Sequence, residues 1–392
     1  MSVVKDSGVR AIAPPFGDEH EELRATIRRW VSAEIVPFQD EWEERREFPR
    51  ELYERAGELG FLGLKYPTEL GGQGGDSLHD AVWAEEIAAA GISGGVGAGL
   101  GAHTGIATPP VFKFGTPDQH ERFLRPAIAG EKIAALGITE PGAGSDVASI
   151  RTRAERVDGG WIVNGAKTFI TNGVRADLLV CAVKTTPEGG HHGISFLILE
   201  REMEGYEVAR KLEKMGWHAS DTAELSFTDV AVPEENLLGE ENGGFYLIMA
   251  NFQWERLLMA LGAVGGMQWC IDTSVRYAGE REAFGRPIGR FQAIRHKLAE
   301  MALKHEVGRA MTLNALRLFH SGQDALREVT LAKLYTQRAA VEVADDAVQI
   351  HGGYGYMREY HVERALRDAR LGPIGGGTDE VMKEIVGRGL GL

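Results

Sequence analysis

The spacing of hydrophobic residues changes twice along this chain, and this change restricts the fold more than any other feature of the sequence. In the first part, Leu23, Ile27 and Trp30 recur at the spacing of one helical face. The middle part contains short runs rich in Val, Ile, Thr and Phe, such as GWIVNGAKTFIT and DLLVCAV, separated by polar or glycine turns. Long helical patterns then return and continue to the C-terminus.

Helices, then strands, then helices predict segregated layers. We therefore expect an α+β multidomain protein. Its expected segments are an N-terminal tail (1–17), an N-terminal helical domain (18–130), a central antiparallel β-barrel or sandwich domain (131–240) and a C-terminal four-helix-bundle-like domain (241–392). A chain of 392 residues has room for these units, because single hydrophobic cores stop growing at roughly 250–300 residues.

Charge and cysteine content exclude several classes of protein. With 43 basic and 57 acidic residues the formal net charge is −14, so the sequence predicts no nucleic-acid-binding surface. Cys181 and Cys270 lack the spacing of a metal or redox site and are expected to be buried thiols. No apolar stretch reaches the roughly 20 residues of a membrane span, and the start of the chain lacks a signal or transit pattern. These observations predict a cytoplasmic protein.

Three glycine-containing segments could approach a cofactor, and each has a simpler explanation. TEPGAGSD (139–146) follows an apolar strand and offers N–H groups and hydroxyls suited to a pyrophosphate, although an ordinary loop has the same composition. REAFGRPIGRFQ (281–292) could clamp phosphates or merely connect two helices. QIHGGYGYMREY (349–360) fits close approach to a planar ligand or a tight turn between helices. His191 and His192 have no partner at ligand spacing, so no metal site is predicted.

Two further segments carry candidate chemistry. LGPIGGGTDEV (371–381) places three glycines before a helical pattern, which leaves a bare backbone able to receive an anion or a carbonyl oxygen. NFQWERLLMALGAVGGMQWC (251–270) is apolar apart from Glu255 and Arg256. These two residues form either a structural ion pair or a site in which the carboxylate is a base with a perturbed pKa.

Taken together and in order, these motifs resemble the acyl-CoA dehydrogenase family over nearly the whole chain. The motifs that carry the resemblance are TEPGAGSD, NGAKTFITNG, KLEKMGWHASDTAELSFTDVAVP, REAFGRPIGRFQ, QIHGGYGY and IGGGTDEV. The resemblance implies a helical domain, a β-domain and a helical bundle, with FAD as cofactor and an acyl-CoA as substrate. It also implies an electron-transfer flavoprotein as electron acceptor and a homotetramer built as a dimer of dimers.

The resemblance assigns the flavin to two groups of residues. Within one subunit the implied contacts are Leu136, Ile138, Thr139, Ser145, Phe169, Thr171, Thr378 and Glu380. Residues implied to reach the FAD of a neighbouring subunit are Arg281, Phe284, Gln292, Gln349 and Gly353. Most relatives carry Trp where Phe169 stands, and Phe keeps the stacking surface but lacks the indole N–H.

The resemblance also places the catalytic base. Many family members remove the α-proton with a glutamate at the position of Gly376, whereas the long-chain and isovaleryl branches carry it at the position of Glu255. We therefore expect Glu255 to be the base while the β-hydrogen leaves as hydride to flavin N5. The Gly376 N–H would bind the thioester carbonyl oxygen. Substrate burial should raise the Glu255 pKa and Arg256 should oppose the rise, and the sequence leaves the balance open.

Substrate contacts complete the expectations. They are Ser145, Gln253, Arg256, Gly97, Gly101 and Gly377. Medium-chain enzymes have larger polar side chains where Gly97 and Gly101 stand, so these glycines favour a medium-to-long acyl chain, although a helix-packing notch or a loop would also explain them. Alternatives are an isovaleryl-type enzyme, an acyl-CoA oxidase and a non-catalytic flavoprotein that binds a partner.

Overall fold

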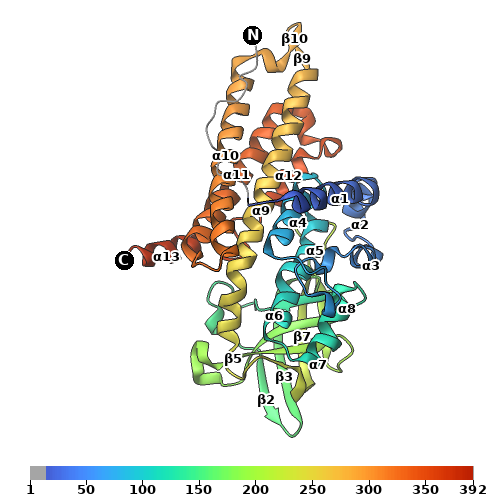
Figure 1. The fold of residues 1–392 in the computed structure, drawn as a ribbon, viewed down its shortest axis with the longest axis vertical. Coiled ribbons are helices and arrows are strands. Elements are labelled where there is room, and N and C mark those ends of the chain that lie inside the picture. Colours follow the sequence, from blue (N-terminus) through green and yellow to red (C-terminus); the bar gives the residue numbers. More distant parts are fainter. Residues whose placement is uncertain (1–14, 392) are drawn as a thin grey trace.

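The computed structural model describes residues 15–391 and consists of three parts along one long axis (Figure 1). A β-sheet lies at one end, long helices reach the other end, and the N-terminal helices pack between them at the side (Figure 1). This arrangement confirms the expected α+β architecture. Most of the expected N-terminal tail, residues 1–14, lies outside the described residues.

The N-terminal part is helical. Its elements are α1 (Asp18–Glu34), α2 (Gln39–Arg45), α3 (Glu51–Glu58), α4 (Ser77–Ala89), α5 (Gly94–Gly101), the π-helical turn η3 (Ala102–Ala107), α6 (Thr108–Phe114), α7 (Pro117–Gln119), the π-helical turn η4 (His120–Leu124) and α8 (Arg125–Ile128). The stripe on α1 is buried as its spacing predicts, since Ile27 and Trp30 belong to a core that also contains Trp83 of α4. Asp76 caps α4 by accepting from the Leu78 N–H at 2.8 Å.

The central part is one eight-stranded sheet with the strand order β6-β7-β3-β2-β4-β5-β8, and β1 also pairs with β4. The strands are β1 (Ala134–Gly137), β2 (Arg153–Val157), β3 (Gly160–Thr171), β4 (Leu178–Lys184), β5 (Ile194–Glu200), β6 (Tyr206–Lys211), β7 (Thr222–Pro233) and β8 (Leu237–Leu238). Most pairs are antiparallel as predicted, but β1 and β2 each pair with β4 in parallel. The central domain is thus mainly antiparallel as expected, and the parallel pairs are an addition that the β2–β3 hairpin, which lies between β1 and β4 in the chain, makes possible.

Strand β4 joins two cores. All of its residues are buried, which explains the uninterrupted apolar run in the sequence. Leu178 and Val180 pack in a core shared with the N-terminal helices, whereas Leu179 and Cys181 pack in a core inside the sheet domain. Because successive strand residues face opposite sides, one strand holds the sheet domain against the helical domain.

The C-terminal part is built on long helices. Its elements are α9 (Gly244–Glu280), the hairpin of β9 (Glu282–Ala283) and β10 (Arg286–Pro287), α10 (Gln292–His320), α11 (Leu326–His351), α12 (Val362–Ala369) and α13 (Asp379–Gly389). Helix α9 runs from the sheet to the hairpin at the far end of the molecule and packs on α4, α10 and α11 (Figure 1). Cys181 and Cys270 are free and buried, as predicted. In the described chain, no helix combines the length and the apolarity that crossing a membrane requires.

Candidate active site

The loop between α12 and α13 presents bare backbone to α9. Gly376 and Gly377 have φ angles of 62° and 96°, a region that favours glycine. Arg256 donates from Nε to the Gly376 carbonyl oxygen at 3.1 Å, and Lys333 donates from Nζ to the Gly377 carbonyl oxygen at 2.6 Å. These bonds fix both carbonyl oxygens. Within residues 15–391, the Gly376 N–H donates no hydrogen bond and is free for a ligand.

The carboxylate of Glu255 occupies the space beside Gly376. A Cβ added to Gly376 would lie 3.5 Å from Oε1 of Glu255 and 2.4 Å from Sδ of Met259. The first distance is an ordinary contact, but the second is a collision. Glycine is therefore required at 376 as long as Met259 keeps its position, and the carboxylate beside it belongs to Glu255 of α9.

Burial controls the protonation of Glu255. Burial raises its pKa to about 7, whereas the positive charges of Arg256 and Lys333 lower the pKa without cancelling this effect. Among the described residues Glu255 forms no ion pair with Arg256, whose guanidinium binds the glycine loop instead. The structural ion-pair interpretation of these two residues is thus not supported. A carboxyl group with this pKa can accept a proton near neutral pH.

Glu255 lines a cavity of about 350 Å³ that passes between α4, α5, α9, α11 and α12. Thr171, at the end of β3, lines the same cavity. Many of the lining residues have small side chains or none, among them Gly97, Gly101, Gly262, Gly266, Ala340 and Ala365. Because the surface of this cavity is mainly apolar, it fits an apolar ligand.

The glycines of α5 serve two faces of one helix. Gly97 and Gly101 line the cavity, and a Cβ on Gly101 would meet nothing within 4 Å. A Cβ on Gly99 would lie 2.7 Å from the Phe48 ring, and one on Gly95 would lie 2.7 Å from the Ala219 nitrogen. Gly95 and Gly99 therefore form packing notches. Of the two glycines for which a notch was the alternative, Gly101 borders open space, whereas Gly97 lines the cavity but a Cβ there would lie 3.2 Å from Cγ2 of Ile87.

Several residues expected to bind the flavin gather where β1 ends against β3. The buried Lys167 donates from Nζ to the Ile138 carbonyl oxygen at 3.0 Å, and the Thr168 N–H donates to the Thr139 carbonyl oxygen at 2.9 Å. The next residue, Phe169, has φ 60° at an irregularity in the β3–β7 pairing and is 69% exposed. An irregular strand thus turns an aromatic ring outward beside the end of β1.

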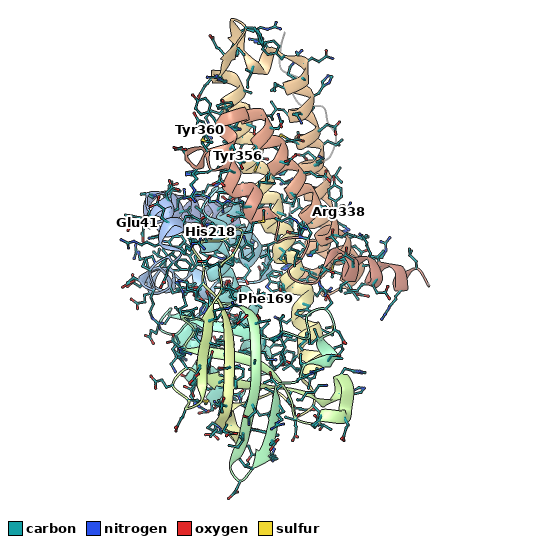
Figure 2. All side chains as sticks on the ribbon, turned by 180° about the vertical axis from the view of Figure 1, so that it is seen from behind. Glu41, Phe169, His218, Arg338, Tyr356 and Tyr360 are labelled. Atoms are coloured by element: carbon teal, nitrogen blue, oxygen red, sulfur yellow. The ribbon has the colours of Figure 1, made fainter. Side chains whose placement is uncertain are left out.

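These residues fit an isoalloxazine ring. Phe169 offers a flat apolar surface at the junction of sheet and helices (Figure 2), and the half-buried Thr139 and Thr171 offer hydroxyls near it. Leu136 is half-buried on β1, and Ser145 is exposed in the turn that follows. A ring stacked there would lie close to the cavity that Thr171 and Glu255 share.

The second group of expected flavin contacts lies elsewhere. Arg281 and Gly353 line another cavity of about 450 Å³, and Phe284 is 95% exposed at the tip of the β9–β10 hairpin. The hairpin is at the end of the molecule opposite to the sheet (Figure 1), whereas Phe169 lies next to the sheet (Figure 2). Gln292 and Gln349 are exposed on α10 and α11. One chain therefore does not bring the two groups together.

The remaining expected residues are distributed around the glycine loop. Thr378 caps α13 by accepting from the Val381 N–H at 3.3 Å. Glu380 is exposed in the first turn of α13, where hydrogen bonds from its own backbone N–H and from Thr378 lower its pKa. Gln253 is half-buried on α9, but it does not line the cavity, because residues two apart on a helix face different sides.

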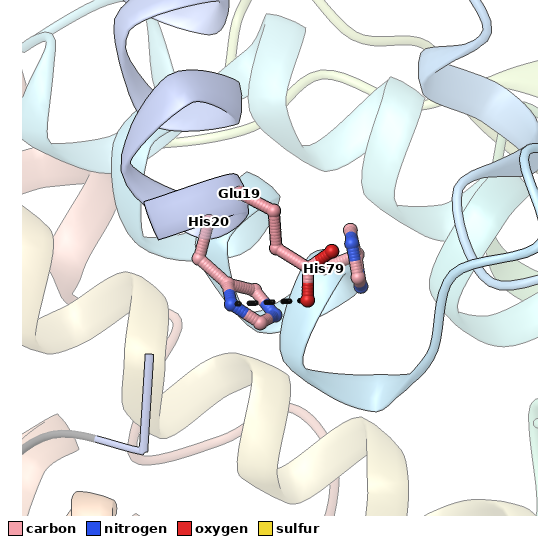
Figure 3. Close-up of side chains that lie close together, drawn as sticks. All are labelled: Glu19, His20 and His79. Atoms are coloured by element: carbon pink, nitrogen blue, oxygen red, sulfur yellow. Dashed lines mark ion pairs between the residues drawn. The ribbon is translucent and has the colours of Figure 1, made fainter. Parts of the chain in front are cut away.

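One cluster resembles a metal site and is better explained as a pair of helix caps. Glu19, His20 and His79 have possible ligand atoms within 4.8 Å of one another (Figure 3). His20 Nδ1 accepts from the Gly17 N–H at 3.0 Å, so the proton of its neutral ring is on Nε2. That buried Nε2 has no partner among the described residues and would have to lose its proton to bind a metal. The chemistry therefore gives no reason to assign a metal here.

Sequence reasoning missed several residues of the site. Met259 fills the space at Gly376, Lys333 holds the loop, and Gln337 donates to the Met259 carbonyl oxygen at 2.7 Å. Lys333 is fully buried, and burial lowers its pKa to about 8. A lysine beside the apolar stripe of α11 was the only available signal, and it is indistinguishable from a solvent-facing lysine in sequence.

Comparison with known sequences gives a consistent result along the chain. Residues 17–131 match the N-terminal domain of acyl-CoA dehydrogenases, residues 135–230 the middle domain and residues 242–391 the C-terminal domain. The long-chain specific acyl-CoA dehydrogenase of Rattus norvegicus mitochondria is 41% identical over 98% of this chain and 88% of its own length. The isovaleryl-CoA dehydrogenase of Oryza sativa mitochondria is 39% identical over 96% of this chain and 92% of its own length.

Solved structures agree. A probable acyl-CoA dehydrogenase from Mycobacterium abscessus superposes with a TM-score of 0.93 at 47% sequence identity, covering 95% of this chain and 99% of that chain. Sequence and fold thus point to the same group of proteins over almost the full length.

Proposed function

This chain belongs to the acyl-CoA dehydrogenase family of FAD-dependent oxidoreductases, and on that premise we propose that it oxidises a medium-to-long-chain fatty acyl-CoA to the trans-2-enoyl-CoA. Glu255 removes the α-proton in this proposal. FAD, when bound, would supply the acceptor for the β-hydrogen as a hydride. Leu136, Thr139, Phe169 and Thr171 would hold the flavin beside the cavity.

The observation that carries this proposal is the position of the Glu255 carboxylate beside Gly376. A thioester whose α-carbon lay between them would have a base on one side and a free backbone N–H within the loop. The Gly376 N–H would donate to the thioester carbonyl oxygen and stabilise the charge that develops as the proton leaves. The pKa of about 7 leaves Glu255 largely ionised in mildly alkaline solution.

The proposed substrate class follows from the cavity. Its glycine-rich wall on α5 leaves open space at Gly101, which favours a linear chain of medium to long length. The glycines at 97 and 101 each cost roughly 1 kcal/mol of helix propensity relative to alanine, so the open wall is obtained at the expense of helix stability. Gln253, Ser145, Gly377 and Arg256 stay proposed substrate contacts.

The separation of the two flavin groups supports an assembly of several chains. We propose that Arg281, Phe284 and Gln349 reach the flavin of a neighbouring subunit, within a homotetramer built as a dimer of dimers. An electron-transfer flavoprotein is the proposed electron acceptor, and a cytoplasmic location is part of the same proposal.

Anaerobic titration tests the reaction. Acyl-CoAs should bleach the flavin of the wild-type enzyme, and Glu255→Gln should slow bleaching by roughly 10²–10⁴-fold, the contribution typical of a positioned base, with FAD still bound. Glu300→Gln, an exposed acid on α10, is the matched control and should bleach normally. Near-normal bleaching by Glu255→Gln would refute the assignment of the base.

The same titration separates the alternatives. A non-catalytic flavoprotein would show no bleaching with any acyl-CoA, and an isovaleryl-type enzyme would bleach best with isovaleryl-CoA. An oxidase would release hydrogen peroxide in air, whereas a dehydrogenase would need an added electron acceptor.

A further inference from the structure

We propose that Trp217 and Trp269 close the cavity at the end remote from Glu255 and thereby set the longest acyl chain that the protein accepts. This inference rests on the proposed function, since it concerns the acyl chain of the same substrate. Neither tryptophan belongs to the residues expected to bind substrate, and both line the cavity.

The direction of the cavity follows α9. Glu255, Met259, Gly262, Gly266 and Trp269 all line it. Steps of three and four residues place them on one face of the helix, so this face forms one continuous wall. At about 1.5 Å of rise per residue, the helix advances roughly 21 Å from Glu255 to Trp269. An extended alkyl chain of roughly 16 carbons has this length, at about 1.3 Å per carbon for bonds of about 1.5 Å.

Trp269 closes the cavity on the side of α4. Its indole lies directly against Gly91 in the turn after that helix, because a Cβ on Gly91 would lie 1.8 Å from the indole Nε1. Gly91 has φ 65°, and its carbonyl oxygen accepts from Nη2 of Arg364 at 2.9 Å. The surface on which the indole rests is therefore fixed backbone.

Trp217 closes the cavity at the N-terminus of α5. A Cβ on Gly94 would lie 2.7 Å from Cδ1 of the indole, so this ring also packs on bare backbone. Trp217 has φ 54°, a conformation that a bulky residue rarely adopts without support. Asp368 gives that support. Its two carboxylate oxygens accept hydrogen bonds from the backbone N–H of Trp217 at 2.6 Å and from the backbone N–H of Gly94 at 3.0 Å.

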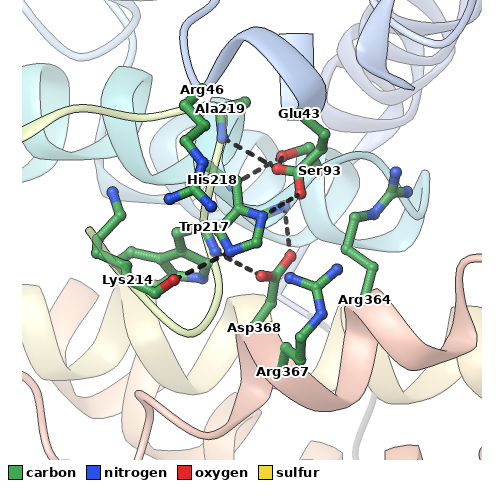
Figure 4. A network of polar contacts seen from close by, with 12 residues as sticks. Glu43, Arg46, Ser93, Lys214, Trp217, His218, Ala219, Arg364, Arg367 and Asp368 are labelled. Carbon is green, nitrogen blue, oxygen red and sulfur yellow. Dashed lines mark hydrogen bonds and ion pairs between the residues drawn. The ribbon is translucent and has the colours of Figure 1, made fainter. Parts of the chain in front are cut away.

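The loop that carries Trp217 is held by a polar network from three parts of the fold (Figure 4). Glu43 of α2 accepts from Ser93 Oγ at 2.5 Å and from the Ala219 N–H at 3.0 Å. His218 Nε2 lies 3.0 Å from the Lys214 carbonyl oxygen. Glu43 of α2 and Asp368 of α12 thus accept hydrogen bonds from the backbone of this loop, and the start of α5 packs against it, so the backbone that carries the Trp217 indole is held from three sides.

A binding experiment without turnover tests the inference. Dissociation constants of saturated acyl-CoAs from octanoyl to docosanoyl are measured by calorimetry on the flavin-loaded Glu255→Gln protein, and then with Trp217→Ala or Trp269→Ala added. The affinity should rise roughly fourfold per methylene up to a limiting length, as expected for burial of a methylene group. Each alanine variant should move that limit to longer chains, with a gain in affinity of roughly 16-fold for two further methylenes. Trp217→Phe and Trp269→Phe keep a flat ring and should keep the parental limit.

Two glycine variants test the direction of the cavity with little risk to folding. A Cβ on Gly101 or on Gly266 would meet nothing within 4 Å, and leucine is a better helix former than glycine. Gly266→Leu should lower the affinity only for long acyl chains, whereas Gly101→Leu should lower the affinity for shorter acyl chains as well.

Three results would overturn the inference. They are a limit unchanged in both alanine variants, the same limit in the two leucine variants, and an affinity that does not depend on chain length. Failure of the proposed function gives a different result, because wild-type flavin would then resist bleaching whatever these binding profiles show.

Discussion

Arg256 donates a hydrogen bond from Nε to the carbonyl oxygen of Gly376 at 3.1 Å, so the residue next to Glu255 holds the loop that faces Glu255. Helix α9 thereby carries the proposed base, Glu255, and holds the backbone of Gly376 opposite to it through the next residue, Arg256. Their spacing depends on this one contact and on the Lys333 bond to Gly377, and substitutions at these positions are expected to be coupled.

The raised pKa of Glu255 predicts a pH-dependent stability difference. Burial raises the pKa from 4.5 to about 7, so the folded state favours the protonated form. This contribution to stability is complete below pH 4.5 and is lost as the pH rises through 7. Relative to wild type, Glu255→Gln should therefore gain up to about 3 kcal/mol between pH 5 and pH 8. Urea unfolding of both proteins at several pH values measures this, and a constant difference would contradict the assigned burial.

Gly376→Ala should destabilise the protein and impair flavin reduction. The substitution combines a left-handed backbone, which costs roughly 1–2 kcal/mol for a residue with a Cβ, with the collision at Met259. Gly322→Ala is the matched control, since Gly322 has φ 73° and its Cβ would meet nothing within 4 Å. Denaturant unfolding should show a clearly larger loss for Gly376→Ala, and equal losses would mean that Met259 moves aside.

Lys333→Met should shift the pH dependence of flavin reduction to higher pH. The positive charge of Lys333 lowers the Glu255 pKa, and its removal leaves only Arg256 to oppose burial. The rate of bleaching should then need a higher pH to reach its plateau. Lys304→Met, which removes an ion pair with Glu342 on the same bundle, is the control and should leave the profile unchanged. An unshifted profile for Lys333→Met would show that this charge does not reach the base.

Lys167→Met should lower the free energy of unfolding much more than the surface substitution Lys132→Met. Lys167 is fully buried and lies 2.7 Å from Glu140, and its loss leaves the buried carboxylate with hydrogen bonds from the Arg151 and Thr152 N–H groups but without its cationic partner, which costs roughly 3–5 kcal/mol. Lys132→Met removes a partly exposed pair with Glu200 at 3.5 Å and should cost roughly 0–1 kcal/mol. The flavin content of Lys167→Met should also fall, since Lys167 holds the Ile138 carbonyl oxygen. Similar stability losses in the two variants would count against a buried pair.

The architecture was predictable because periodicity reports burial directly. The stripe on α1 and the uninterrupted run of β4 are buried as their patterns indicate. The parallel pairing of β1 with β4 was not predictable, because periodicity shows which faces are buried and not which strands become neighbours.

The candidate site was predictable in part. Glu255 and Gly376 followed from motif resemblance, and the structure brings them together. The residues that support them were missed for a physical reason. Met259 and Trp269 lie in an apolar helix, where sequence does not distinguish a side chain that fills the core from one that borders a cavity.

The glycines of α5 also show which differences the sequence does not reveal. Gly95 and Gly97 are two positions apart in one repetitive segment, yet one is packed against Ala219 and the other borders the cavity. Only the orientation of α5 relative to its neighbours separates their roles.

The wall formed by Gly97, Gly101, Gly262 and Gly266 also limits how this protein can change. Glycine has no side chain to lose, so every substitution at these positions adds atoms to the passage. Substitutions at these four positions therefore narrow the passage, and the space that they fill is regained at those positions by a return to glycine.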